Sequence, residues 1–456
     1  MVTLVLHAHL WGGRQRKYDW LNAHEVSNSQ WAEVRPHSPS YWFVPRDSTL
    51  QAEYEAGWKI TDAMRVNVLG FQTHRDHFAI DFDSDSLMKR IAEMRGKEIS
   101  DVSYMAKYAI SDNRDWQLTN ARQMIRNDSN WPAHLIRCAY RPFDYRATYF
   151  SQVAMDYPRR DLMDHIAGKD NLNLNLVRQT RSLTWQHIMT SNLPTPAIFI
   201  EVKDGSTVFP LYLYYAATDA DRNNIQESVS SRPRCNLAPE FVQDFSGRLK
   251  MSFVPDGRGD LTKTFGAEDA FAYIYGVFHS LTYRTRYAEF LKIDFPRVPL
   301  ASNADLFRAL CEKGQELVDL HLMRDERLNN PSFWGTSYPV AGAHDVTCVD
   351  CRYPGDSAPD QDQPLETGRV FINKAQPRKG TDAEYFDGVP PEVWEFRIGG
   401  YQVLDHWLKE RKRHKRCLTL EDIEHFQKVV AVLRETIRLM AEIDDAIEAH
   451  GGWPIK

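Results

Sequence analysis

The clearest pattern of hydrophobic and polar positions lies near the C-terminus. Across residues 420–447, apolar side chains recur every three or four positions, as they do along one face of an α-helix. Thr419 and Asp422 have the residue types and the spacing of a capping box at its start. Helices of this kind are stabilised mainly by packing. We therefore expect this helix to contact other elements along most of its length.

Three other segments have helical periodicity. Residues 84–127 are highly charged, with apolar positions at helical spacing, and we interpret them as a helical spacer. Residues 267–291 and 305–322 carry broader apolar faces. Residues 14–21 are predicted to form a shorter helix. Helices therefore occur in several separate parts of the chain.

Between residues 136 and 300 the pattern changes to short aromatic and β-branched runs, separated by Pro, Asn, Asp and Gly. This punctuation is typical of strands joined by turns. The runs that predict strands are 138–140, 147–150, 172–177, 197–202 and 208–215. Further candidates nearer the N-terminus are 2–11, which has the pattern of a buried strand, 40–44 and 66–71.

These patterns predict an α+β protein with a β-rich middle domain, a helical spacer and long C-terminal helices. A single strand at 2–11 needs a sheet to join, so we interpret residues 1–83 as the last part of a domain whose earlier part is absent. The other predicted parts are a spacer at 84–130, a β-rich domain with a helical end at 131–328, an insertion at 329–380 rich in Gly, Pro, Asp and Gln, and a C-terminal helical part at 381–456.

The stretch 385–408 connects several of these features. Pro390 and Pro391 precede a short helical pattern, and Gly399-Gly400 stops it. Tyr401 then begins an apolar face of helical period, and a basic run follows at 409–416. A glycine hinge between an aromatic anchor and a basic segment favours binding as readily as catalysis.

The composition limits the classes of protein to which this chain can belong. The chain has 456 residues, 43% hydrophobic and 26% charged, which is typical of a globular protein of two or three domains. Its net charge of −6 gives no overall attraction to nucleic acid. Residues 131–300, however, carry 20 Lys+Arg against 18 Asp+Glu, and 15 of those 20 are arginine. The arginine fork suits phosphate and guanine.

Localisation follows from what the sequence lacks. The six cysteines do not form a disulfide framework, and the apolar N-terminus has no basic region or cleavage site of a signal peptide. No apolar run approaches the roughly 20 residues that span a bilayer. We expect a cytoplasmic protein with no membrane partner.

Three short motifs partly match known functional sites. His344, Cys348 and Cys351 have the spacing of half a zinc site, but a fourth ligand is missing nearby, so a structural role is favoured and no metal is expected. Asn330-Pro331-Ser332-Phe333 nearly matches the Asn-Pro-Pro-Tyr/Phe motif of amino-group methyltransferases, with Ser332 breaking it. His74-Arg75-Asp76 occurs without the other kinase motifs.

Three segments have the composition of a binding surface. Residues 140–146 alternate arginine with aromatics, and residues 173–181 place Asn, Arg and Gln at the end of an alternating strand, where they can contact base edges. The basic run at 409–416 can contact phosphates. The structural alternatives are an Arg–Asp pair that braces an aromatic core, a polar strand edge, and a solvated helix end.

Residues 270–300 resemble the C-terminal specificity region of Type ISP restriction-modification enzymes. Six other stretches agree with that family in the same order along the chain: 10–21, 43–47, 140–146, 209–214, 394–408 and 420–444. The resemblance implies that a nuclease, a helicase-like ATPase and an adenine methyltransferase precede the target-recognition domain. It also implies that residues 1–83 are the tail of a methyltransferase-like α/β domain, that residues 131–328 are the β-rich target-recognition domain, and that residues 381–456 are its C-terminal helical part. The Gly-rich cofactor loop, the methyltransferase motif and the ATPase motifs are absent from this sequence, so no catalytic residue, cofactor or metal can be assigned.

We therefore expect sequence-specific recognition of duplex DNA, together with a methyltransferase and translocase–nuclease module supplied by the missing upstream part or by another chain. The candidate DNA-binding residues are Arg141, Arg146, Arg178, Gln179 and Arg181, with Lys374, Arg397, Tyr401 and Gln402 on the facing side. The alternatives are an S-adenosylmethionine-dependent DNA adenine N6-methyltransferase in its own right and a protein-interaction scaffold built on the long helix.

Overall fold

The structure is a computed structural model that describes residues 4–36, 41, 43–44, 49–215, 233–340, 342–357, 365–375 and 382–455. Within these residues the chain forms two compact units, Met1–Ala56 and Gly57–Lys456. Both helices and small sheets are present, so the predicted α+β class is confirmed. The five-part division of the chain stays a prediction.

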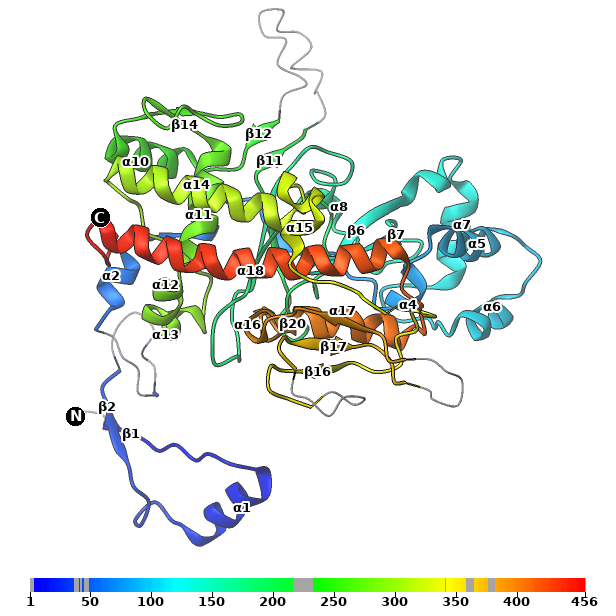
Figure 1. The fold of residues 1–456 in the computed structure, drawn as a ribbon, viewed down its shortest axis with the longest axis horizontal. Helices are drawn as coiled ribbons and strands as arrows, with labels where there is room; N and C mark the ends of the chain where they lie inside the picture. Colours follow the sequence, from blue (N-terminus) through cyan, green and yellow to red (C-terminus); the bar gives the residue numbers. More distant parts are fainter. Residues whose placement is uncertain are drawn as a thin grey trace, which may run out of the picture. The chain divides into compact units, whose positions relative to one another are not determined.

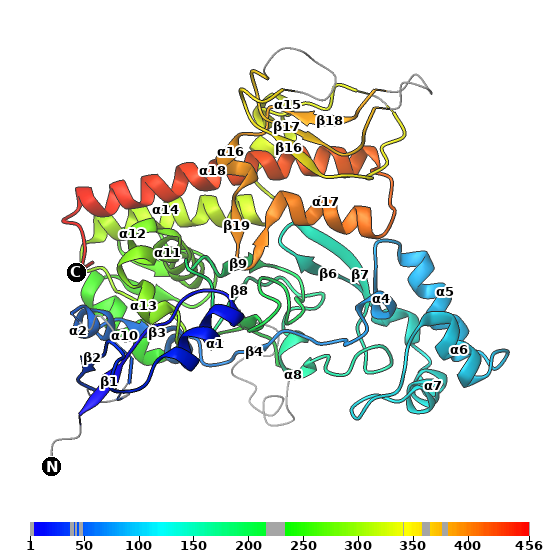
Figure 2. The same cartoon turned by 90° about the horizontal axis from the view of Figure 1, so that it is seen from below.

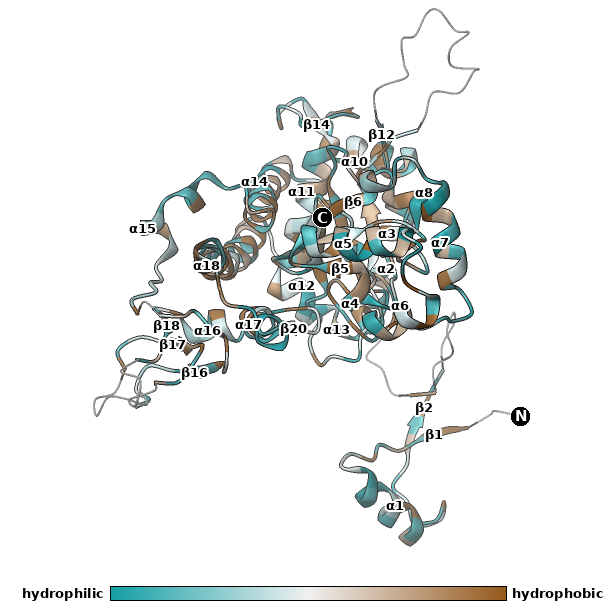
Figure 3. Cartoon of the chain, turned by 90° about the vertical axis from the view of Figure 1, so that its right-hand side faces the viewer, coloured by the Kyte–Doolittle hydropathy of each residue, from teal (hydrophilic) through white to brown (hydrophobic). Residues whose placement is uncertain are grey.

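The first unit contains a two-stranded sheet. β1 (Val5–His7) pairs antiparallel with β2 (Ala32–Val34). Between them lies α1 (Arg14–Ala23), which is mostly hydrophilic and has no buried residue (Figure 3). A short helix, α2 (Gln51–Glu55), ends the unit. The predicted strand within 2–11 and the predicted helix from residue 14 are confirmed, although the strand is not buried, since Leu4 and Leu6 are exposed. The strand candidate at 40–44 lies largely outside the described residues.

A long helix organises the second unit. α18 (Leu420–Ala449) has α14 (Ala304–His321) along one side and α17 (Val403–Arg413) along the other (Figures 1 and 2). Its capping box is present: the Thr419 hydroxyl accepts from the Asp422 amide at 3.1 Å, and the Asp422 carboxylate accepts from the Thr419 amide at 3.0 Å. The helix, its cap and its extensive packing were predicted and are confirmed.

Two glycines allow α14 to approach α11 (Ala267–His279) closely. A Cβ at Gly314 would overlap the carbonyl oxygen of Ala272, and one at Gly276 would lie 3.0 Å from that of Leu310. Every residue of α11 except Glu268 is buried. The chain continues into α12 (Leu281–Arg286) and α13 (Ala288–Leu291), so the helical region expected at 267–291 is present as three segments.

The strands of this unit form small sheets. One has the order β4-β10-β8-β9, with bounds Val68–Leu69, Thr207–Pro210, Asn173–Leu176 and Ile188–Ser191. Another has the order β5-β7-β6, with bounds Ile80–Asp81, Asp144–Tyr149 and Leu135–Arg141. Four of the strands expected after residue 136 are confirmed. The fifth, at 197–202, is wrong: this run forms turns, because Phe199 donates its amide to the carbonyl of Pro196. Most of its residues are buried, but Val202 is exposed.

Shorter strands and helices connect the elements described above. The paired strands are β3 (Trp58–Lys59) with β15 (Arg297–Val298), β11 (Tyr212–Leu213) with β12 (Arg234–Cys235), and β13 (Ser252–Val254) with β14 (Thr264–Gly266). The remaining helices are α3 (Ile60–Ala63), α4 (Asp76–Ala79), α8 (Arg160–Met163), α10 (Pro239–Leu249) and the 3₁₀ turns Trp131–His134 and Glu326–Asn329.

The helical region predicted at 84–127 is confirmed as α5 (Ser84–Arg95), α6 (Asp101–Tyr108) and α7 (Leu118–Asn127). These helices share one hydrophobic core with the β5-β7-β6 sheet; Leu87, Ile91 and Tyr104 belong to it together with Cys138 and Tyr149. The shared core fixes the position of α4 against the inner strands.

The C-terminal part adds a small sheet and a hairpin. The sheet has the order β16-β17-β18 (Asp350–Arg352, Arg369–Phe371, Tyr385–Asp387), and α15 (Pro331–Trp334) precedes it. Pro391 opens α16 (Pro391–Trp394), as predicted. Gly399-Gly400 then forms the turn between β19 (Arg397–Ile398) and β20 (Tyr401–Gln402). Tyr401 was predicted on a helical face, which is wrong, because it pairs in β20 before α17 begins.

Candidate nucleic-acid interface

A loop at residues 177–187, between β8 and β9, carries three of the predicted contact residues; we call it the arginine loop. Arg178 and Arg181 are 72% and 75% exposed at their side chains, and Gln179 is also exposed. Each arginine has one carboxylate partner among the described residues: Arg178 lies 3.4 Å from Asp294, and Arg181 lies 3.6 Å from Asp204. A guanidinium has five N–H donors, so most of those of this loop remain available to a ligand.

The base of the arginine loop is anchored by buried side chains. His187 lies under it, with Nε2 3.2 Å from the Thr180 hydroxyl and 3.3 Å from a Glu201 carboxylate oxygen. The hydrogen bond from His187 holds the pKa of Glu201 at about 2, below its ordinary value. The Thr180 amide also donates to the carbonyl of Lys292 at 3.2 Å. The exposed arginines are therefore carried on a fixed support.

The β19–β20 hairpin docks on this support. Gly399 donates its amide to the carbonyl of Gln186 at 2.8 Å, and Gly400 donates to that of Ile200 at 2.9 Å. Gly399 has a φ of 58°, and a Cβ there would overlap the Ile200 oxygen. Only glycine accommodates both this backbone conformation and this contact. The sequence signal Gly399-Gly400 thus corresponds to a docking turn.

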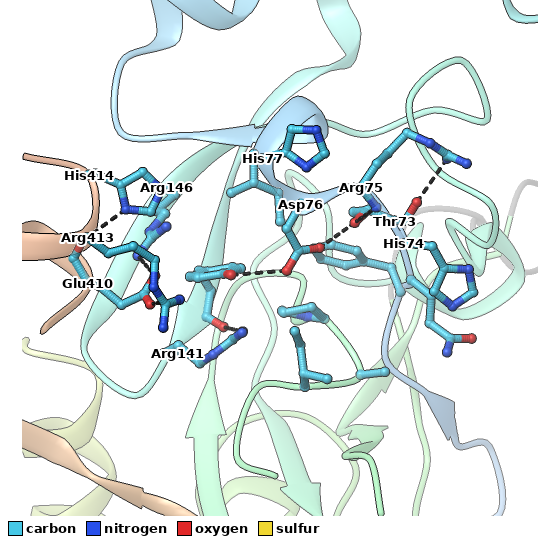
Figure 4. Close-up of a pocket in the computed structure, with 17 residues that line it drawn as sticks. Thr73, His74, Arg75, Asp76, His77, Arg141, Arg146, Glu410, Arg413 and His414 are labelled. Carbon is cyan, nitrogen blue, oxygen red and sulfur yellow. Dashed lines mark hydrogen bonds and ion pairs between the residues drawn. The ribbon is translucent and has the colours of Figure 1, made fainter. Parts of the chain in front are cut away.

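Beside the hairpin lies a cavity of about 550 Å³, which we call the basic cavity. Residues 71–77, the strands β6 and β7, residues 196–198 and the end of α17 form its walls (Figure 4). Its charged lining residues are Arg75, Arg141, Arg146, Arg413, Asp76 and Glu410. Three histidines, His74, His77 and His414, also line it. Cations therefore exceed carboxylates at this site.

Arg141 is the most unusual group in the basic cavity. The residue is only 7% exposed, and its guanidinium carbon lies over the Tyr140 ring, 3.9 Å from the ring centroid. Its Nη1 donates to the carbonyl of Tyr140 at 2.6 Å, while its buried Nε has no hydrogen-bond partner within the described residues. Buried polar groups nearly always have a partner. This donor is therefore unsatisfied within the described part of the chain.

Arg146, by contrast, belongs to an internal ion-pair network. Its Nη2 donates to Asp144 at 2.7 Å and to Glu410 at 2.9 Å, and Arg411 lies 3.0 Å from the other Asp144 oxygen. Burial alone would raise the pKa of Asp144, but Arg411 and Arg146 lower it to about 2. The Arg146 guanidinium also lies 4.0 Å from the ring centres of Phe82 and Tyr140. This network ties β7 to α17. It corresponds to the structural alternative considered for residues 140–146, in which an Arg–Asp pair braces an aromatic core.

The other predicted residues fall in different places. Tyr401 is buried, donates its hydroxyl to the carbonyl of Ile198 at 2.8 Å, and has its ring 5.4 Å from the Arg141 guanidinium. Gln402 donates to the carbonyl of Trp394 at 2.8 Å. Arg397 and Lys374 are exposed, and neither lines the basic cavity. The structure thus brings Arg141, Arg146 and Tyr401 together and leaves Lys374 in the segment after β17.

Sequence reasoning missed the wall formed by residues 73–77. The His-Arg-Asp triplet was considered only as a kinase motif, yet it lines the cavity. His74 has a φ of 52° and pairs with Asp156 at 2.6 Å, and Asp76 accepts from the Tyr140 hydroxyl at 3.0 Å. The run of polar residues at 72–77 was the only signal available.

Side chains of the zinc-like motif at 344–351 and of the methyltransferase-like motif at 330–333 form hydrogen bonds within the chain. His344 bonds through Nδ1 to Glu384 at 2.9 Å, and within the described part of the chain no group of three or more His, Cys, Asp or Glu side chains could hold a metal ion. The Asn330 side chain accepts from the Ser332 amide at 3.1 Å and caps α15. Among the helices that the structure describes, none is long and apolar enough to cross a membrane.

Three solved structures share the fold over 94% of this chain. One is a nuclease-deletion mutant of the Type ISP restriction-modification enzyme LlaGI in complex with a DNA substrate mimic (18% identity, TM-score 0.61). The others are a DrdV–DNA complex (17%, 0.64) and the ATP-dependent Type ISP enzyme LlaBIII bound to DNA (18%, 0.62). The matched regions are 38%, 42% and 27% of those chains, so this chain spans less than half of each.

A search of curated proteins gave no match. The family model described as the Type ISP C-terminal specificity domain, however, matches residues 62–442, which include both the arginine loop and the basic cavity. The resemblance found in the sequence is confirmed over most of the chain. This protein belongs to the family of Type ISP C-terminal specificity domains.

Proposed function

We propose that this chain recognises a target sequence in duplex DNA and that the arginine loop makes the base contacts. The observation that carries the proposal is the exposure of Arg178, Gln179 and Arg181 on one anchored loop. Arginine forms paired hydrogen bonds with guanine, and glutamine does so with adenine, in the major groove. Asp294 and Asp204 occupy only part of the donors of the two arginines.

Rigidity supports the same assignment. Specificity requires that a side chain meet one base edge in a fixed position, and Thr180, His187 and the β19–β20 hairpin hold the base of the loop from below. Arg397, exposed at the start of that hairpin, extends the basic surface. Arg146 has a different task in this proposal: it holds β7 and α17 together and leaves the reading of bases to the loop.

Catalysis lies outside this chain in our proposal. The proteins of similar fold are more than twice as long, and one of them is described as ATP-dependent. We infer that a methyltransferase and translocase–nuclease module, in the same polypeptide or in a partner, acts on the site that this domain selects. An S-adenosylmethionine binding assay checks the division: this chain alone should show no binding.

The primary experiment is a selection from randomised duplexes with the purified chain at two salt concentrations. A short asymmetric motif in the bound pool supports sequence recognition. Binding without a motif that vanishes as salt rises shows only attraction to the phosphate backbone, and overturns recognition by this chain alone. Loss of the motif in Arg178→Ala, with the melting temperature unchanged, assigns the contact to the loop.

A further inference from the structure

We propose that two exposed apolar side chains, Leu183 and Val202, read the C5 methyl group of thymine in the major groove. The inference rests on the proposed function and deepens it, because it names two further specificity-determining residues on the same surface. The major-groove edge of thymine carries a methyl group beside its O4 acceptor, and an apolar side chain distinguishes it from cytosine. Arg178, Gln179 and Arg181 supply hydrogen bonds for guanine and adenine but no apolar partner for a methyl group.

Leu183 belongs to the arginine loop. It is 91% exposed, the largest exposed fraction among the large hydrophobic residues of the described chain. Trp185, two residues later, is 3% exposed and packs edge-on against Phe278, with the ring centres 6.1 Å apart. The chain therefore passes from an exposed leucine to a buried anchor within two residues. The apolar surface of Leu183 is thus held in solvent on a fixed support, where a ligand can bury it.

Val202 lies on a neighbouring turn and is 59% exposed. The Glu201 carboxylate accepts the amide of Val202 at 2.9 Å and that of Lys203 at 3.1 Å. Because Glu201 also bonds to the histidine beneath the arginine loop, the turn and the loop share one anchor. The pairing of Arg181 with Asp204 at 3.6 Å joins them a second time. The two apolar side chains are therefore carried by adjacent segments with a common support.

An exposed cation accompanies each of these apolar side chains. Arg181 precedes Leu183 by two residues. Lys203 directly follows Val202, and it is exposed as well. The core of a protein–protein interface is depleted of charged residues. The major groove of DNA, by contrast, presents methyl groups beside hydrogen-bond acceptors and is bordered by phosphates. The mixture of apolar and cationic side chains therefore favours DNA over a protein partner for this surface.

The test removes one methyl group at a time from the DNA. Once selection has given the preferred duplex, each thymine of the motif, in either strand, is replaced in turn by uracil, which differs from thymine only in lacking the C5 methyl group. Wild type should lose affinity by about threefold to fivefold at two positions, one for each side chain, because one buried methyl group is lost at each. Competition titration against the unmodified duplex at fixed salt measures each ratio.

Two variants assign the methyl groups to side chains. Leu183→Ala should bind the thymine and uracil duplexes equally at one of the two positions and keep the preference at the other. Val202→Ala should show the converse. Both side chains are exposed, so both variants should keep the melting temperature of wild type. Leu420→Ala, at a leucine that is 73% exposed at the start of α18, is the matched control and should keep both preferences.

The remaining outcomes separate the two proposals. Equal binding of every thymine and uracil duplex by wild type, or a selected motif without thymine in either strand, overturns methyl reading and leaves sequence recognition standing. Preferences that survive in both variants also overturn it, because other residues are then the cause. A preference lost in only one variant keeps that residue as a methyl contact and excludes the other. A bound pool without any motif contradicts the proposed function itself, and methyl reading with it.

Discussion

The arginine loop and the ion-pair network of Arg146 contain the same side chain in opposite circumstances. Arg181 is 75% exposed and meets a carboxylate at 3.6 Å. Arg146 is 4% exposed, meets two carboxylates within 3.0 Å and lies between two aromatic rings. Both segments alternate arginine with other residues, and both were interpreted as DNA contacts. What distinguishes them is whether the guanidinium itself is buried among carboxylates and aromatic rings, as in Arg146, or projects into solvent, as in Arg181.

Removing the buried cation should have the largest effect. Arg146→Ala leaves Asp144 and Glu410 buried without their shared partner, which should lower the free energy of unfolding by about 3–5 kcal/mol. Urea unfolding followed by tryptophan fluorescence measures this change. Arg181→Ala is the comparison, and it should stay within about 0.5 kcal/mol of wild type. Similar losses in the two variants would erase the distinction between the regions.

Binding should respond in the reverse order. Arg181→Ala should weaken binding of the selected duplex by about 1–3 kcal/mol if the guanidinium contacts a base. Arg181→Lys keeps the charge but loses the planar fork, so it should restore non-specific affinity and not the preferred motif. Titration of selected and scrambled duplexes at fixed salt measures both. Full restoration by lysine would instead make Arg181 a phosphate contact.

Acid should weaken the buried network selectively. The folded-state pKa of Asp144 is about 2, below its ordinary 3.8, so its ionised form stabilises the fold above about pH 4. That contribution, about 2 kcal/mol, should disappear as the pH falls from 4 to 2. Unfolding free energies of wild type and Asp144→Asn across this range isolate the effect. A constant difference between the two curves would contradict it.

The smallest expected effect concerns the hairpin. Tyr401→Phe removes the hydrogen bond to the carbonyl of Ile198 but keeps the ring near Arg141. The free energy of unfolding should fall by about 1 kcal/mol. Chemical denaturation measures it, with Tyr18→Phe as a control on the exposed α1. No change would mean that water replaces the bond and that the hairpin is held by its glycines alone.

Local patterns in the sequence predicted local structure well. The helical period at 420–447 and the Thr419 cap are confirmed because both depend on residues within a few positions of one another. The alternation at 173–177 likewise placed Arg178 correctly at a strand end. Tyr401 was assigned to a helix because its spacing from Leu404 fits one, whereas pairing with Ile398 holds it in a strand.

The candidate site depended on contacts that no local pattern contains. Arg146 and Glu410 are 264 residues apart, so their ion pair could not be inferred from the run at 140–146. The cavity wall at 73–77 reaches Tyr140 only because β5 pairs with β7. Family resemblance identified the class of domain, but it gave no positions for these contacts. Which arginine lies inside and which outside is decided by the tertiary fold.

The β19–β20 hairpin has a consequence for how the two regions respond to a ligand. Gly399 donates a hydrogen bond to the arginine loop, and Tyr401, two residues further along the chain, donates one to the wall of the basic cavity. A shift of this single turn displaces both. Any ligand that occupies the cavity should therefore alter the affinity of the loop for its base pairs, and thermodynamic linkage requires the reverse effect to be equally large. Selectivity would then be a cooperative property of the two regions.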